Sequence, residues 1–213
     1  MSVAIRVEPR LYQQARLAQA LTIGWMLVEG IVATGSGIVA SSVALTAFGF
    51  DSGLEVFSAL VVLLQLSRPR SSAPEVLAKG ERRASRLTGY ALYALAVYIV
   101  LSSGYTLVRG IHPDPSIPGL VLAIASVVIM PGLWRWRLRL SRQIHSAALR
   151  ADAACSAVCL YMAVTLLVGL ALNQLLGWWW ADPVAGLAMI WWIRGEANEA
   201  LEAAATGKHC EDC

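Results

Sequence analysis

Charged residues are scarce in this chain. Asp, Glu, Lys and Arg together make up 15% of its 213 residues, whereas soluble domains carry about 25%. Hydrophobic residues instead reach 57%, and the mean hydropathy is +0.60. A soluble fold of this length cannot bury so much apolar surface, but a lipid bilayer can accommodate it. The composition therefore excludes an ordinary soluble domain and leaves room for one compact membrane domain.

Cysteine is rare as well, and its placement argues against a disulfide scaffold. Cys155 and Cys159 fall inside an apolar stretch, and Cys210 and Cys213 end a tail that we expect in the cytoplasm. The sequence shows no recognisable signal peptide, internal repeat or nucleophile–base group. We therefore expect neither an enzyme nor a nucleic-acid-binding protein.

Six apolar stretches predict an all-α fold, a polytopic membrane bundle of six transmembrane helices. We place these stretches at about 17–40, 43–66, 87–108, 119–133, 146–172 and from about 183 onward. Between them, the polar stretches 67–86 and 134–145 are predicted to be loops. The last apolar stretch is interrupted by Arg194, and we expect it to continue as an amphipathic helix to about residue 205, partly in the inner interface.

The basic residues indicate how the bundle sits in the membrane. The two ends of the chain and the loops of one side hold all of the 17 Lys and Arg residues except Arg109. Because Lys and Arg concentrate in short cytoplasmic loops, we expect both termini in the cytoplasm. The chain then divides into a cytoplasmic segment (1–16), a six-helix transmembrane domain (17–205) and a cytoplasmic Cys/His tail (206–213). It is predicted to be a multi-pass protein of the cell membrane.

Two pairs of potential metal ligands lie within the predicted helices. Asp51 and Glu55 on the second helix, and Cys155 and Cys159 on the fifth, are each spaced i, i+4, so each pair shares one helical face. At about 1.5 Å per residue, both pairs reach the middle third of the bilayer. Acids at that depth usually mark function, and no Lys or Arg is predicted there to pair with them. A cysteine in an apolar helix is commonly a small buried hydrophobe, but two carboxylates and two thiols together would suit Zn²⁺.

Two further acids could assist this predicted site, and the sequence leaves their roles open. Glu29, in the middle of the first helix, could be another ligand, a proton acceptor or a protonated packing residue. Asp152, one turn before Cys155, could serve metal entry or proton movement, or could cap its helix or pair with Arg150.

The C-terminal tail and a pair of glycines carry weaker signals. His209, Cys210 and Cys213 could hold a soft metal, although a tail without any role has the same appearance. Gly49 and Gly53 form a G-x-x-x-G step that would let another helix approach closely. We expect small residues of the fifth helix, Ala154 and Ala157, to be its partners.

Three segments resemble one family of membrane transporters. GSGIVASSVALTAFGFDSGLEVFSALVVL is similar to the first-to-second helix region of cation diffusion facilitators (the cation efflux family), SAALRADAACSAVCLYMAVTLLVGL to their fifth helix, and WWWADPVAGLAMI to the start of their sixth. The resemblance implies a homodimeric exporter of divalent metals, most often zinc, exchanged against protons. It also implies that the second and fifth helices provide the metal ligands.

The chain departs from the family pattern in three respects. Many members carry His and Asp where this chain has Cys155 and Cys159, and the stretch 67–86 contains no histidine. The cytoplasmic domain that follows the sixth helix in many members has no counterpart before Cys213, so we expect a short, transmembrane-only branch. Dimerisation through such a domain does not carry over.

Together these observations predict proton-coupled export of a divalent transition metal, zinc first, by alternating access. The predicted ligands are Asp51, Glu55, Cys155 and Cys159. Two thiols also leave open the export of a softer or different ion, such as cadmium, mercury, cobalt, iron or copper. A membrane protein that binds metal without transporting it is the remaining alternative. The expected partners are the lipid bilayer, the metal ion, protons and a second copy of the chain.

Overall fold

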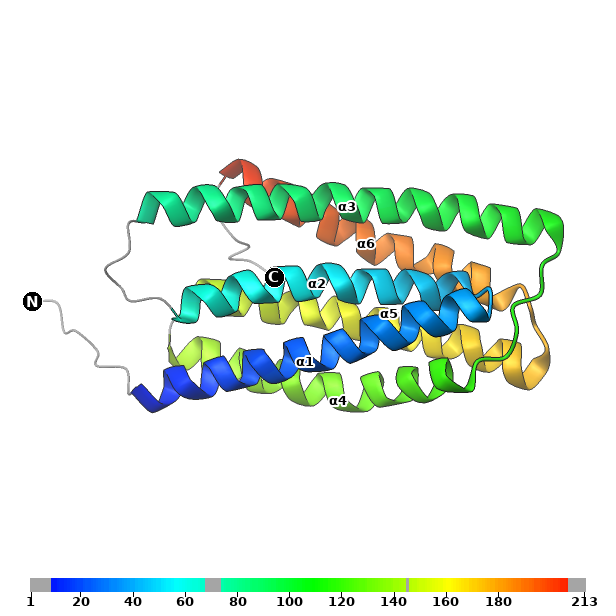
Figure 1. Ribbon diagram of the computed structural model, residues 1–213, viewed down its shortest axis with the longest axis horizontal. Coiled ribbons are helices and arrows are strands. Elements are labelled where there is room, and N and C mark those ends of the chain that lie inside the picture. The colour runs from blue at the N-terminus through cyan, green and yellow to red at the C-terminus, as the bar shows by residue number, and fades with distance from the viewer. Residues whose placement is uncertain (1–8, 68–73, 145, 207–213) are drawn as a thin grey trace, which may run out of the picture.

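The computed structural model describes residues 9–67, 74–144 and 146–206, and these residues form helices and no strand. The helices, which follow one another in antiparallel order in Figure 1, are α1 (Pro9–Val39), α2 (Val43–Ser67), α3 (Pro74–Arg109), α4 (Ile117–Gln143), α5 (Ala147–Leu176) and α6 (Ala181–Thr206). In this part of the chain, α1 to α5 are long and apolar enough to cross a membrane. The prediction of an all-α, polytopic membrane bundle is confirmed.

Two predicted loops are largely helical instead. Most of 67–86 belongs to α3, which begins at Pro74, and most of 134–145 belongs to α4, which continues to Gln143. Proline is well tolerated in the first turn of a helix, and the Arg, Leu, Glu and Ala of these stretches are good helix formers. Hydropathy marks the part of a helix that meets lipid, whereas the helix itself continues beyond the bilayer.

The helices divide into a bundle and a pair. α1, α2, α4 and α5 pack around one another, and α3 pairs with α6 along one side of this bundle, at the top of Figure 1. α2 and α5 are the bundle helices that α6 contacts, and α3 contacts α2. Side chains of α2 and α5 that face away from α1 and α4 therefore point toward α6.

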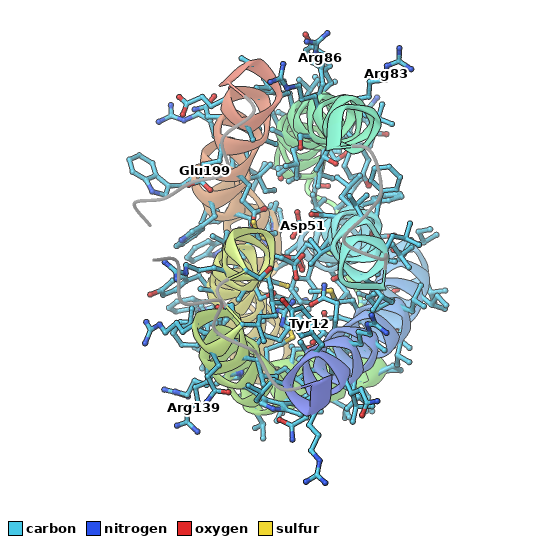
Figure 2. All side chains as sticks on the ribbon, turned by 90° about the vertical axis from the view of Figure 1, so that its left-hand side faces the viewer. Tyr12, Asp51, Arg83, Arg86, Arg139 and Glu199 are labelled. Atoms are coloured by element: carbon cyan, nitrogen blue, oxygen red, sulfur yellow. The ribbon has the colours of Figure 1, made fainter. Side chains whose placement is uncertain are left out.

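The cytoplasmic end of the molecule is identified by its charge. α1 begins and α6 ends at the same end of the bundle, on the left of Figure 1. Figure 2 faces that end and shows Arg83, Arg86 and Arg139 extending outward from α3 and α4. By the positive-inside rule this end lies in the cytoplasm.

The contact between α1 and α2 is unusually close. A Cβ atom on Gly49 would lie 2.5 Å from the backbone nitrogen of Thr34, and one on Gly37 would lie 2.6 Å from that of Thr46. The expected approach of Gly49 and Gly53 to the fifth helix is therefore wrong for Gly49, which meets α1. The spacing of small residues identifies a contact face but not the partner. Because the connection between α1 and α2 is short, these two helices pack against each other.

At the outer end of the bundle, Asp182, the second residue of α6, connects α6 to the start of α2. Its carboxylate accepts a hydrogen bond from the Ser42 hydroxyl at 2.5 Å and another from the Val43 backbone amide at 2.9 Å. Since the first amides of a helix lack partners within it, Asp182 completes the start of α2. The outer ends of α2 and α6 are thus held together.

Candidate metal site

Three of the four predicted ligands converge inside the bundle. One ligand atom from each of Asp51, Glu55 and Cys159 lies within 4.8 Å of the other two. Asp51 and Cys159 are fully buried, and Glu55 is 9% exposed. Figure 2 shows Asp51 in the interior, between α2 and the helices opposite. A dicarboxylate–thiol group of this size can surround a single divalent ion.

The helices bring these side chains inward because the ligands occupy core positions. On α2, Phe48, Asp51, Glu55 and Ala59 repeat at three- and four-residue intervals and are all buried. On α5, Cys159 continues the buried line that includes Met162, Ala163 and Leu166. The site is therefore enclosed by apolar packing, and lipid does not reach it.

The carboxylates of this cluster have no counter-ion among the residues that the structure describes. Neither oxygen of Asp51 and neither oxygen of Glu55 takes part in a hydrogen bond with any residue that the structure describes. Burying an ionised carboxylate without a partner costs several kcal/mol, roughly, and such groups are ordinarily paired or bound to a metal. Two of them, beside a thiol, form an arrangement that a cation or a proton would stabilise.

Glu29 lies beside the cluster but is bound to other groups. Its carboxylate accepts hydrogen bonds from the hydroxyls of Ser126 and, at 3.4 Å, Ser52. It acts electrostatically on Asp51 but is not one of the three converging ligands. Of the three predicted roles, direct ligation is the one that this placement does not support.

Cys155 is separated from the converging ligands. It lies one turn closer to the cytoplasmic end than Cys159 and is only partly buried. The group within mutual reach comprises Asp51, Glu55 and Cys159 without it. The tail residues His209, Cys210 and Cys213 lie outside the described residues, and their predicted role stays a prediction.

Asp152 belongs to a second buried charge cluster, nearer the cytoplasm. It forms an ion pair with Arg137 of α4 at 2.5 Å and accepts a hydrogen bond from Gln19 of α1 at 2.8 Å. Arg137 is fully buried and also donates to the Ser156 hydroxyl. Gln19 in turn donates to the backbone carbonyl of Ala59 on α2 at 3.2 Å. This inner network joins α1, α2, α4 and α5.

The inner network corrects two predictions. Asp152 pairs with Arg137 and not with Arg150, while the cap of its helix is Ser146, whose side chain accepts from the Leu149 amide. The sequence predicts Arg137 in a cytoplasmic loop and no basic residue inside the bundle. Because α4 continues through 134–143, Arg137 instead lies on its buried face, seven residues after Met130. Two turns of a helix return a side chain to the same face, and this spacing could have revealed it.

Sequence reasoning also missed Glu196, on α6. Its side chain is 8% exposed, and its Oε1 atom has no hydrogen-bond partner among the described residues. The carboxylates of Asp51 and Glu55 act electrostatically on that of Glu196. The signal was again spacing, because Glu196 follows the buried Met189 by seven residues and Ile193 by three.

Comparison with known proteins identifies the family. Residues 16–197 match the family described as the cation efflux transmembrane domain. The chain belongs to the cation efflux family. The family membership and the helical spans together make it a multi-pass membrane protein of a transporter family.

Two relatives support this assignment. An uncharacterized transporter of Synechocystis, sll1263, is 30% identical over 183 residues, which cover 82% of this chain and 59% of the relative. An uncharacterized transporter of Bacillus subtilis, YdbO, is 26% identical over 203 residues, which cover 90% of this chain and 69% of the relative. The chain thus spans about three fifths of the first relative and about two thirds of the second.

Proposed function

We propose that this protein exports a divalent transition metal, zinc in the first instance, in exchange for protons and by alternating access. One observation carries the proposal. The carboxylates of Asp51 and Glu55 are buried without hydrogen-bond partners among the described residues, and they meet the Cys159 thiol within 4.8 Å. A group of this kind gains most from a bound cation, and the family of the chain supports transport over storage.

The ligand set fits zinc. Carboxylate oxygen and thiolate sulfur are both ligands of Zn²⁺, and sites with three protein ligands keep a fourth position open. An open position lets an incoming or leaving ion exchange its last water for a protein atom. The fourth predicted ligand, Cys155, is one turn away, and an ion moving between the site and the cytoplasm would pass close to it.

Charge balance supports coupling to protons. Two carboxylates and one thiolate around a divalent ion leave a net charge of about −1 in a poorly solvated interior, which is unfavourable. Metal ligands must also be deprotonated to bind, so metal entry releases protons. Protons arriving from the outside would then replace the ion and release it. Glu29, buried beside Asp51, is the further acid that could hold a proton in this exchange.

Alternating access requires two closures around the site. Toward the cytoplasm, the ion pair between Arg137 and Asp152 bridges α4 and α5. Toward the outside, Asp182 bridges α2 and α6. We propose that the inner network opens to admit the ion and that the outer contact opens to release it. The second copy implied by the family resemblance also belongs to the proposal, and chemical cross-linking in the membrane tests it.

Softer ions are the second candidate, and the Cys159 thiol favours them. Thiolate ligands prefer soft metals, so cadmium or another soft ion could be carried as well as zinc. A protein that binds metal without moving it would have the same cluster, and flux alone separates these functions.

The test is metal flux into proteoliposomes, with the internal pH recorded, across a panel of Zn²⁺, Cd²⁺ and Co²⁺. We expect metal uptake coupled to a pH change in the wild-type protein and neither signal in Asp51→Asn. The matched control is Asp114→Asn, because Asp114 is an exposed acid in the loop between α3 and α4. Metal binding without flux in any metal would contradict the proposal, and flux without a pH change would remove proton coupling from it.

A further inference from the structure

The cytoplasmic half of α4 carries three exposed arginines on one face. Arg135, Arg139 and Arg142 follow one another at intervals of four and three residues, so they occupy one side of the helix, and all three are exposed. Arg137, between them in the sequence, points to the opposite side and is fully buried. Figure 2 shows Arg139 extending outward from the bundle. This segment of α4 therefore presents one side to the inner network and the other to the surroundings.

The positive charge of this face is not balanced by acids. The sequence of α4 contains neither Asp nor Glu, and none of the three arginines forms an ion pair with another residue that the structure describes. Other helices at the same end of the molecule mix acids with their basic residues, as α3 does with Glu81 and α6 with Glu199. Guanidinium groups without a carboxylate partner are well suited to bind phosphate, because charge and N–H donors act together.

Toward the outside of the membrane, the same face of α4 continues as apolar surface. Val128, two turns before Arg135, is exposed, and so are Ile124 and Val121 at the preceding intervals of four and three residues. α4 packs against α1 and α5, and this face is directed away from them. The face is thus apolar along the membrane and cationic at its cytoplasmic end. A phospholipid presents its acyl chains and its phosphate in the same order.

The arginines lie at the depth of the inner headgroups. At about 1.5 Å per residue, Arg135 lies roughly 27 Å below the outer start of α4, and Arg142 lies about 10 Å further. Because the hydrocarbon core is about 30 Å thick, the three arginines extend from its inner edge into the headgroup region. Trp134 and Trp136, of the residue type that is enriched at this interface, flank Arg135. The Arg135 guanidinium lies 5.6 Å from the centre of the Trp134 ring.

We propose that this face of α4 binds an anionic phospholipid of the cytoplasmic leaflet, whose phosphate is held by Arg135, Arg139 and Arg142. Charge complementarity selects a lipid of net negative charge, since a zwitterionic headgroup would bring a further cation to the arginines. A second copy of the chain fits this face poorly, because the arginines of both copies would meet in a two-fold symmetric contact. Lipid binding does not depend on transport, so this proposal and the proposed function can fail separately.

Native mass spectrometry of the full-length protein tests the proposal, with phosphatidylglycerol as the probe and phosphatidylcholine as the zwitterionic comparison. We expect the wild-type protein to retain phosphatidylglycerol in preference. The triple variant Arg135→Gln, Arg139→Gln, Arg142→Gln should weaken this binding about tenfold or more, since one basic residue near an anionic lipid contributes about fivefold.

The matched control is the triple variant Arg82→Gln, Arg83→Gln, Arg86→Gln. It removes the same number of exposed arginines from the same end of the molecule, but from α3. If the α4 face is the binding site, this control should weaken phosphatidylglycerol binding by less than about twofold.

A charge-preserving variant and a stability measurement guard against a folding defect. Changing the three α4 positions together by Arg135→Lys, Arg139→Lys and Arg142→Lys keeps the charge and should retain most of the affinity. Since a ligand that binds the folded state stabilises it, phosphatidylglycerol should raise the Tm of the wild-type protein more than that of the α4 glutamine variant.

Three results would overturn the lipid site. One is wild-type binding of phosphatidylglycerol in the α4 glutamine variant. Another is an equal loss in the α3 and α4 glutamine variants, which would mean that general charge attracts the lipid. The third is a dimer in the same spectra that the α4 glutamine variant dissociates while lipid binding is unchanged, which would assign this face to a second copy.

Discussion

Two layers of buried charge lie within this bundle, and they differ in how they are satisfied. In the inner layer, Arg137 and Asp152 pair with each other and reach Gln19 and Ser156. In the middle layer, Asp51 and Glu55 have no hydrogen-bond partner among the described residues. A buried charge that is paired with an opposite charge is structural, and a buried carboxylate without a partner is available to a ligand. The contrast predicts opposite responses to neutralisation.

The largest effect should come from breaking the inner layer. Asp152→Ala leaves the Arg137 guanidinium buried without its counter-ion, and we expect the free energy of unfolding to fall by about 3–5 kcal/mol. Reversible unfolding in detergent measures it, with the exposed Arg150→Ala as the control. The double variant Arg137→Met, Asp152→Leu should recover much of the loss, since it removes both charges. Equal stability of Asp152→Ala and the wild type would mean that the pair is not structural.

Neutralising an acid of the middle layer should abolish transport without lowering the free energy of unfolding. Glu55→Gln replaces a buried carboxyl group that has no counter-ion by a neutral amide of similar shape, so we expect unchanged or higher stability. Transport should nevertheless fall by more than about 100-fold, because a metal ligand is lost. Flux and unfolding should be measured on the same preparation. A loss of stability as large as that of Asp152→Ala would show that the two layers do not differ in kind.

A smaller effect should separate the two cysteines. Cys159→Ser replaces a soft ligand of the cluster by a hard one, and we expect Cd²⁺ transport to fall about tenfold relative to Zn²⁺ transport. Cys155→Ser should change that ratio less, because Cys155 lies outside the converging group. Competition between the two metals in one flux assay gives the ratio. Wild-type ratios in both variants would make the thiols packing residues.

The smallest effect should be at the outer contact. Asp182→Asn keeps the shape of the side chain but weakens its hydrogen bonds to Ser42 and Val43, and we expect a loss of about 1 kcal/mol in stability. Thermal unfolding measures this loss. A change near that of Asp152→Ala would place the outer contact in the same class as the inner network.

The sequence alone predicted the parts of this molecule that depend on spacing along one helix. Apolar stretches predicted the helices, and i, i+4 spacing predicted that Asp51 and Glu55 share a face. The sequence did not predict which helices pack together, because spacing along one helix does not identify the neighbouring helix that its face contacts. Asp51 and Glu55 meet Cys159 without Cys155, and Gly49 meets α1 where α5 was expected.

Arg137 and Glu196 were missed for a related reason. Each lies in the cytoplasmic half of its helix, where a charged residue is ordinarily assigned to water. Hydropathy averages over a window and so hides one charge that lies on a buried face. Their spacing from buried residues, seven after Met130 and seven after Met189, distinguishes these two residues from the exposed charges beside them.

The contact of Asp182 with Ser42 and Val43 also has a consequence for biogenesis. A chain is synthesised from its N-terminus, so the start of α2 leaves the ribosome about 140 residues before Asp182 does. During that interval the first amide of α2 lacks the acceptor that it has in the finished protein. The hairpin of α1 and α2 therefore enters the membrane before the helix that completes the start of α2 has been synthesised. A nascent chain that is truncated before α6 therefore offers quality-control proteases an unfinished helix end.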